Sequence, residues 1–294
     1  MILRPLRDTE EDAEAVGVVA AAAFGAPHAL GGAPGTPEPP ERIARFRSIN
    51  RHLARTDPGG CWLALDDAGT PVGTALSTRR EGTWGLALFA VLPQAQGRGV
   101  GRELLAAALL HGRACLRGII CGSRDPRAAA AYRQAGFTLH PAMRLRGPVD
   151  KARLAAPDGA VHEGSAKHRD MMDSVDRRTR GGAHGPDHEE LLRHYALLVV
   201  DDLAGSGYVY VDAANDGRVH LLAATSRRLA KRLLTAALLS APEGAGAEVR
   251  NLTAEQEWAV DVGLAAGLEL TNAGYVCLRG MRPPNPYIPS GMFL

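Results

Sequence analysis

The sequence has few of the features that mark several classes of protein. Aromatic residues make up only 5% of its 294 residues, and its formal net charge is +2 with histidine neutral. Proteins that bind nucleic acid usually carry a basic stripe with interleaved aromatic residues, so we expect no nucleic-acid partner. The longest apolar runs, such as residues 104–110, are far too short to cross a bilayer, so no membrane partner is expected either.

Cysteine is also scarce, and its pattern argues against a structural zinc. The four cysteines are Cys61, Cys115, Cys121 and Cys277, and none forms a C-x-x-C pair. Five histidines between residues 162 and 194 are irregularly spaced, so we expect solvated loop and helix residues and no metal. They are His162, His168, His184, His188 and His194. Reduced thiols and the absence of a signal-peptide pattern after Met1 favour a cytoplasmic protein.

Apolar periodicity predicts a regular order of elements in the first half. Helices are expected over residues 8–24, 41–56, 99–113 and 126–135, and strands over 61–65, 72–77, 84–92, 117–121 and 137–145. Residues 25–40, rich in glycine and proline, are expected to form a loop. The 46% apolar content is enough for a buried core. This order predicts an α/β (α+β) domain over residues 1–147.

The second half repeats the first. The strand that ends in Asp66-Asp67 has a counterpart ending in Asp201-Asp202, residues 102–110 resemble 231–239, and 135–139 resemble 266–270. The offset stays between 129 and 135 in all three. We therefore predict two copies of one fold, over residues 1–147 and 168–294, with a linker over 148–167.

The most informative segment joins a strand to a helix and reads V-L-P-Q-A-Q-G-R-G-V-G-R over residues 91–102. Glycines at 97, 99 and 101 let the backbone turn tightly, so that successive N–H groups point inward at the start of a helix. Such a turn suits a pyrophosphate, and Arg98 and Arg102 add positive charge. The spacing is neither G-x-G-x-x-G nor that of a P-loop.

Two motifs in this half resemble the GNAT (N-acetyltransferase) superfamily. Gln96-x-x-Gly99-x-Gly101, preceded by Val91-x-Pro93, resembles the acyl-CoA signature of that family. The stretch from Asp125 to Phe137 resembles a second family motif, N-x-x-A…Y-x-x-x-G-F, with Asp125 in place of the usual asparagine.

The resemblance implies two tandem GNAT folds, each a mixed, mostly antiparallel sheet flanked by helices. It also implies an acetyl-CoA-dependent transfer to an amine, of a small molecule or a peptide, without a metal. The backbone of Ala90 and Val91 would bind the pantetheine arm. The implied pyrophosphate-binding residues are Gln96, Gly97, Arg98, Gly99, Val100, Gly101 and Arg102, with Asp125 contributing from the second motif. Tyr132 would protonate the leaving thiolate.

Several roles remain open at this stage. Gln96 could only start the helix, Arg98 could be merely solvated, and Tyr132 could be a half-buried aromatic without a role. The general base is unassigned, because residues 82–91 contain no acid. Glu81, His140, a water or a carboxylate at the end of the proline-rich tail 281–294 are the candidates. That tail is expected to be extended and to dock against the first domain beside the acceptor pocket.

The second half lacks the chemistry of the first. Residues 225–230 align with the glycine turn but contain no glycine, and Gly263 stands at the position of Tyr132. We predict that the second half is a degenerate GNAT domain without an acyl-CoA site. This domain either shapes the acceptor pocket or serves as a structural lobe, which could hold two chains together as a homodimer. A non-catalytic acyl-CoA sensor and a transferase for a longer acyl-CoA are the alternative functions.

Overall fold

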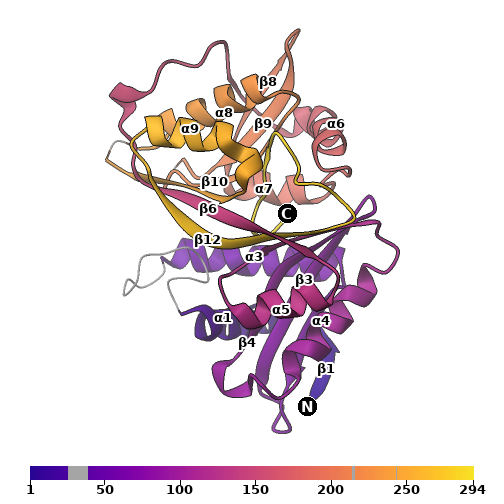
Figure 1. The fold of residues 1–294 in the computed structure, drawn as a ribbon. Helices are drawn as coiled ribbons and strands as arrows, with labels where there is room; N and C mark the ends of the chain where they lie inside the picture. The colour runs from indigo at the N-terminus through magenta and orange to yellow at the C-terminus, as the bar shows by residue number, and fades with distance from the viewer. Residues whose placement is uncertain (26–38, 214–215, 243) are drawn as a thin grey trace. The chain divides into compact units, whose positions relative to one another are not determined.

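The computed structural model describes residues 1–25, 39–213, 216–242 and 244–294 (Figure 1). Contacts within the chain divide it into two compact units, an N-terminal unit of residues 1–115 and a C-terminal unit of residues 116–294. Residues 26–38 of the predicted 25–40 loop lie outside the described part. No helix in the described ranges is both long and apolar enough to span a membrane.

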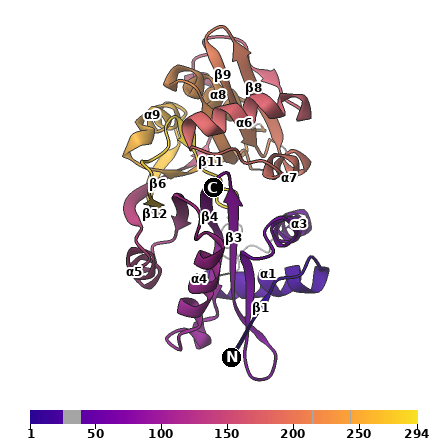
Figure 2. The ribbon, with the colours of Figure 1, turned by 90° about the vertical axis from the view of Figure 1, so that its right-hand side faces the viewer.

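The N-terminal unit is an antiparallel sheet with helices on both faces. Its strands are β1 (Ile2–Pro5), β2 (Cys61–Leu65), β3 (Pro71–Arg80) and β4 (Thr83–Val91), which neighbour one another in that order. Its helices are α1 (Glu10–Phe24), α3 (Pro40–Thr56) and α4 (Val100–His111). Helices α1 and α3 cover one face of the sheet and α4 covers the other (Figure 2).

Local interactions set the ends of these helices and strands. Thr9 caps α1 by accepting a hydrogen bond from the Asp12 N–H, and three acidic residues follow in the first turn. Strands β3 and β4 are joined by Glu81 and Gly82, with φ of 42° and 76°. A two-residue turn with both φ values positive matches the twist of a hairpin, which sends β4 back along β3.

A buried ion pair between Asp57 and Arg80 connects the end of β3 to helices α3 and α4. Asp57, which ends α3, accepts hydrogen bonds from Arg80 Nη1 at 3.0 Å and from the Arg79 N–H at 2.8 Å, and His111 Nε2 of α4 lies 3.1 Å away. Asp57 and Arg80 are only 2% and 6% exposed. Burial raises the pKa of Asp57, but the His111 hydrogen bond and the Arg80 charge outweigh it and hold the pKa below its ordinary value.

Asp57→Asn is expected to lower the free energy of unfolding by about 3–5 kcal/mol, because it leaves the Arg80 guanidinium buried without a countercharge. Denaturant unfolding measures the change. The matched control is Asp67→Asn, which removes the partner of the Met1 amino group at the surface and should change stability little. A stability equal to that of the control would show that the buried pair is not needed.

The C-terminal unit contains two sheets. One runs in the order β5 (Arg117–Gly122), β12 (Glu269–Arg279), β6 (Thr138–Pro148) and β11 (Gly246–Leu252), with antiparallel neighbours. The other runs β13 (Tyr287–Ile288), β10 (Val219–Ala224), β9 (Gly205–Val211), β8 (Ala196–Asp202) and β7 (His162–Glu163), also antiparallel.

Helices of the C-terminal unit pack on both sheets. They are α5 (Pro126–Gln134), α6 (Arg169–Thr179), α7 (Asp187–His194), α8 (Arg227–Leu239) and α9 (Glu257–Ala265). Alternation along β9 directs Tyr208 and Tyr210 toward α6, and Val209 and Val211 toward the apolar side of α8. Helices α6 and α8 therefore cover opposite faces of this sheet.

The first of these sheets mixes strands from both sequence repeats. Strand β12, of the second repeat, lies between β5 and β6 of the first, and β6 in turn lies between β12 and β11 of the second. Each repeat thus places one long strand, β6 or β12, among the strands of the other. The domain limits at 147 and 168 remain a prediction, because this exchange joins both repeats in one sheet.

The proline-rich tail is anchored in the C-terminal unit. Ile288 pairs with Leu222, Asn251 Nδ2 donates to the Pro289 carbonyl at 3.2 Å, and Ser290 Oγ accepts from the Phe293 N–H at 3.3 Å. Leu294 is buried against a cluster from β5, β6 and β12 that includes Ile119, Ala142, Val276 and Leu278. The tail therefore contacts the first repeat, as expected, and its place beside an acceptor pocket stays a prediction.

Most predicted elements of the first half are present with ends shifted by a few residues. Strand β1 is missing from the sequence analysis, because four residues that end in proline are too few to show a period. The predicted linker 148–167 contains short 3₁₀ turns and the two-residue strand β7.

Candidate functional site

The connection between β4 and α4 is built by glycine. Residues 92–99 link the two elements, beginning with a 3₁₀ turn over Pro93–Ala95. Gly97 and Gly99 then have φ of 76° and 86°, in the left-handed region. A side chain at either position would strain the backbone. The path of the loop therefore depends on these two glycines, both of which the sequence analysis selects.

The start of α4 is open to a ligand. Gly99 is its N-cap, and no side chain of the described residues caps it. The first N–H groups of a helix have no partner within the helix, and they carry its partial positive charge. Val100 is buried, while Arg98 and Arg102 are exposed, and Arg102 Nη2 lies 3.6 Å from Glu103 Oε1. This arrangement can bind an anion through its backbone, with two cations beside it.

Glycine also brings α4 close to the sheet. A Cβ on Gly101 would lie 3.3 Å from Phe89 Cζ of β4, and a Cβ on Gly73 of β3 would lie 2.8 Å from Leu104 Cδ1. The sequence analysis did not single out Gly73, because an isolated glycine in a strand gives no sign of which helix approaches it.

Gln96 has a positioning contact. Its Nε2 donates a hydrogen bond to the Val91 carbonyl at 3.0 Å, which ties the glycine loop to the end of β4. We infer that Gln96 shapes the loop through this bond. Its predicted contact with a ligand is a separate point and stays a prediction.

The end of β4 at Ala90 and Val91 directs a backbone N–H away from β3. The Leu92 N–H donates to the Val72 carbonyl at 2.9 Å, so the alternation of an antiparallel strand directs the Val91 N–H away from β3. The register shifts between Leu76 and Ser77, where Ala87 of β4 is the extra residue of a bulge. A bulge increases the local twist of a strand, and this one lies just before the segment predicted to bind pantetheine.

Glu81 lies too far from this segment to act as its base. It is exposed in the turn before β4. Val91 ends the same strand, and an extended chain of that length spans roughly 30 Å. The hypothesis that Glu81 is the general base is therefore wrong for a reaction at Val91, because the strand places the two at opposite ends.

The second motif lies in the C-terminal unit. Asp125 caps α5 by accepting from the Arg127 N–H at 2.8 Å, and its carboxylate also pairs with the Arg127 guanidinium at 2.8 Å. That hydrogen bond from Arg127 outweighs the effect of burial and lowers the pKa of Asp125. Tyr132 is 5% exposed, and the ring lies against Gly122 of β5. Burial raises the pKa of Tyr132, so its phenol is protonated at neutral pH.

Tyr132 and the tail lie on opposite faces of the β5–β12–β6 sheet. Cβ positions at Gly118 and Gly122 of β5 face Phe137 and Tyr132, whereas Ile119, between them in the strand, faces the Leu294 cluster. Residues that alternate along a strand point to opposite faces. His140 shares the face of Ala142 and thus of Leu294, and its Nε2 lies 3.2 Å from Thr138 Oγ1.

The matching connection in the second repeat has no glycine loop. Strand β10 ends at Ala224 and α8 begins at Arg227, so only Thr225 and Ser226 join them. Ser226 Oγ accepts from the Leu229 N–H at 3.3 Å, which caps the helix with its own side chain. The observed connection is too short for a cradle of the kind at 92–99, and this supports the prediction that the second repeat has no acyl-CoA site.

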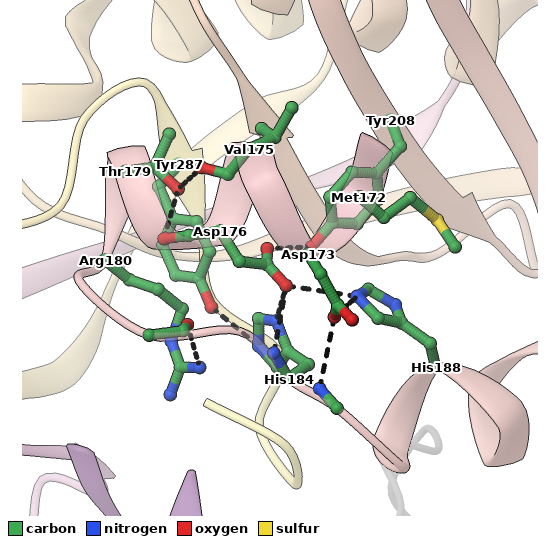
Figure 3. A network of polar contacts seen from close by, with 12 residues as sticks. Met172, Asp173, Val175, Asp176, Thr179, Arg180, His184, His188, Tyr208 and Tyr287 are labelled. Carbon is green, nitrogen blue, oxygen red and sulfur yellow. Dashed lines mark hydrogen bonds and ion pairs between the residues drawn. The ribbon is translucent and has the colours of Figure 1, made fainter. Parts of the chain in front are cut away.

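Two of the histidines expected to be solvated are buried instead. His184 and His188 have no exposed surface, and both contact Asp176 of α6 (Figure 3). Burial lowers the pKa of His184 to about 4, against the opposing effect of Asp176, so its imidazole is neutral. The expectation fails because the polar α6–α7 segment packs beneath β9 and β13. The available signal is Asp173 and Asp176 at i, i+3 followed by His184 and His188 at i, i+4.

Comparison with known proteins supports the reading of the first repeat. A family model described as the acetyltransferase (GNAT) family matches residues 10–137. A search of curated proteins finds no match to the chain.

Solved structures resemble the whole chain. A candidate acetyltransferase of Pyrococcus horikoshii superposes with a TM-score of 0.76 at 18% identity, over 99% of this chain and 95% of that one. A GCN5-related N-acetyltransferase of Sphaerobacter thermophilus gives 0.59 at 14%, over 99% and 98%. A tandem GNAT protein of the clavulanic acid biosynthesis pathway gives 0.56 at 15%, over 96% and 99%. These likenesses show the fold. Residues 10–137, which the family model matches, form a GNAT acetyltransferase domain, and the chain as a whole has a tandem GNAT fold.

Proposed function

We propose that this protein transfers the acetyl group of acetyl-CoA directly to an amine of a small molecule or peptide. The observation that carries the proposal is the glycine loop 96–102, which leaves the first turn of α4 without a side-chain cap inside the family-matched region. We further propose one active site per chain, because Thr225 and Ser226 leave no comparable loop in the second repeat.

In this proposal the CoA pyrophosphate sits on the N–H groups of residues 97–102. Backbone amides and the positive end of α4 bind the diphosphate without depending on a flexible side chain. Exposed Arg98 and Arg102 attract it from solution. The backbone of Ala90 and Val91, where the Val91 N–H points away from β3, binds the pantetheine arm.

The reaction forms one bond and breaks one. The amine nitrogen attacks the thioester carbonyl, an N–C bond forms, and the C–S bond then breaks to release CoA as a thiolate. The outward Val91 N–H is placed to donate a hydrogen bond to the carbonyl oxygen as it gains negative charge. The amine must first lose a proton, which for a lysine-like amine at pH 7 costs roughly 4–5 kcal/mol.

Tyr132 is proposed as the acid for the leaving thiolate. Its raised pKa keeps the proton on the phenol before the reaction, as an acid requires. A thiolate of ordinary pKa, about 8.5 by analogy with cysteine, is a weaker base than this phenolate. The phenol therefore helps most by donating a hydrogen bond that shares its proton with the sulfur as negative charge develops there.

For the base, His140 and a water remain candidates. His140 and Leu294 share one face of the β5–β12–β6 sheet, and Tyr132 lies on the other. Direct transfer needs its base on the side of the attacking amine and its acid on the side of the leaving sulfur.

The test is thiol release by the full chain with acetyl-CoA and a panel of amines, alongside calorimetric binding of CoA. Amine-dependent thiol release with tight CoA binding is the expected result. Binding without release for any amine would favour the alternative of a non-catalytic acyl-CoA sensor, which the absence of an acid over residues 82–91 supports. Faster thiol release from a longer acyl-CoA than from acetyl-CoA would identify the longer acyl-CoA as the donor. Absence of CoA binding would end the proposal.

A further inference from the structure

We propose that Asp176, His184 and His188, joined by Asp173, form a buried binding site for a divalent transition metal, with zinc as the best match. The site lies within the C-terminal unit and is independent of the proposed acetyl transfer. The sequence analysis predicts no metal, and the burial and orientation of these four side chains are the observations against that prediction (Figure 3).

Three ligand atoms converge on one point. His184 Nδ1 lies 2.7 Å and His188 Nε2 lies 3.0 Å from the same oxygen, Asp176 Oδ2, and the three atoms lie within 4.8 Å of one another. Around a tetrahedral zinc with bonds of about 2.0 Å, neighbouring ligand atoms are about 3.3 Å apart. The two distances from Asp176 Oδ2 would each lengthen by a few tenths of an ångström to match this geometry.

Asp173 supplies the fourth ligand. Its Oδ1 lies 3.6 Å from His188 Nε2, and its side chain is 15% exposed, whereas the other three ligands have no exposed surface. The carboxylates of Asp173 and Asp176 would offset the charge of a divalent cation, and Arg169, which pairs with Asp173, is a cation beside them. Asp173 also gives the site its contact with solvent.

The atoms that face away from the converging point are each held by a second group. Tyr208 Oη donates to Asp176 Oδ1, Tyr287 Oη lies 3.1 Å from His184 Nε2, and Tyr210 Oη lies 3.2 Å from His188 Nδ1. Arg169 Nε donates to Asp173 Oδ2 at 3.0 Å. Metal-binding imidazoles and carboxylates are characteristically oriented by such partners on the far atom, which fix the tautomer and the direction of the ligand.

The protons around His188 can be arranged for a metal. A metal at Nε2 requires the proton of His188 on Nδ1, so Tyr210 Oη must accept it and donate its own proton elsewhere. Tyr210 Oη has two further acceptors within reach, the His188 carbonyl at 3.5 Å and Met172 Sδ at 3.7 Å. Without a metal, the imidazoles of His184 and His188 and the backbone N–H of His184, at 3.0 Å, all face Asp176 Oδ2. Three hydrogen-bond donors would then share one oxygen.

The burial of the site points to a structural role. The ligands come from α6, from α7 and from the segment between them, and the tyrosines that hold them come from β9 and β13. A closed set of four protein ligands leaves no position for a substrate. A bound ion would fasten α6 and α7 beneath the sheet of the C-terminal unit and, through Tyr287, hold the proline-rich tail.

The test is the metal content of the full chain, produced with a tag that lacks histidine. Elemental analysis after dialysis is expected to find close to one zinc per chain. Chelator treatment should lower the melting temperature and added zinc should restore it, because a ligand of the native state stabilises that state. Cobalt added to the stripped protein should give the visible absorption of a tetrahedral site.

Four variants separate a metal site from a hydrogen-bonded network. His188→Ala should lose the metal, and its melting temperature should no longer respond to zinc. If His188→Ala fails to fold, Asp173→Asn provides the same test, because it leaves Asp176, His184 and His188 in place. Tyr287→Phe, which removes a partner of His184 outside the ligand set, should weaken zinc binding by about 10–100-fold, and Asp173→Asn, which removes a ligand, should weaken it more. His194→Ala is the control, since His194 lies on the same helix and pairs with Glu190 instead.

Retention of zinc in both His188→Ala and Asp173→Asn would place the metal elsewhere and overturn the proposal. So would a stripped wild-type chain whose melting temperature does not respond to zinc, cobalt, manganese or nickel. In that case the cluster is a closed network of hydrogen bonds. Neither result bears on acetyl transfer, which is measured separately by thiol release.

Discussion

Tyr132→Phe is expected to lower turnover by about 10²–10⁴-fold and to leave acetyl-CoA binding nearly unchanged. The variant removes only the phenol oxygen from a side chain that is 5% exposed, so packing of α5 against Gly122 is retained. Thiol release with the best amine measures turnover, and calorimetry measures CoA affinity. Because a proton donor acts on the leaving sulfur, the loss should fall on kcat rather than on the Kd for CoA.

The matched control is Tyr195→Phe. Tyr195 is a partly buried tyrosine of the same unit, and its ring stacks on His220 at 3.7 Å between centroids, away from the GNAT motifs. Its variant should retain normal turnover. Equal activity of Tyr132→Phe and wild type would remove the acid role, and an equal loss in both variants would indicate a general effect of tyrosine replacement.

Gly99→Ala is expected to weaken CoA binding at least about 10-fold, because a side chain at φ of 86° forces the amides of the loop to turn. The strain itself should cost roughly 1–2 kcal/mol of stability. Space is not the obstacle, since the nearest atom to a Cβ at this position is Arg102 Nη2 at 3.8 Å. Calorimetry with CoA and denaturant unfolding measure the two effects.

Gly69→Ala separates the two effects. Gly69 has φ of 82° in the β2–β3 turn, with no described atom within 4 Å of an added Cβ, so it should suffer the same backbone strain. Its stability should fall as in Gly99→Ala while CoA affinity stays at the wild-type value. If both variants bind CoA as wild type does, the loop is not the pyrophosphate site.

Some parts of this molecule can be predicted from the sequence, because they depend on residues close together in the chain. The cap at Thr9 and the glycine loop at 97–101 each depend on a few adjacent residues. Their chemistry is local, so their sequence signals are strong. The first-half elements were therefore predicted close to their observed ends, with the exception of the four-residue β1.

Other features depend on residues far apart in the chain. The pairing of β12 with both β5 and β6 could not be predicted, because β6 and β12 are copies of one repeat with the same local pattern. Either copy satisfies the periodicity of either position. Only the packing of the complete C-terminal unit selects the exchanged arrangement.

By itself, the sequence determined the repeat, the order of elements in the first half, and the glycine loop with its expected affinity for an anion, because these follow from backbone freedom and periodicity over short stretches. Tertiary structure alone decided that Tyr132 and His140 lie on opposite faces of one sheet, and that His184 and His188 are buried around Asp176. The physical reason is that burial and distance are properties of contacts between remote segments. A histidine in a polar stretch has the same local pattern whether it faces water or the underside of a sheet.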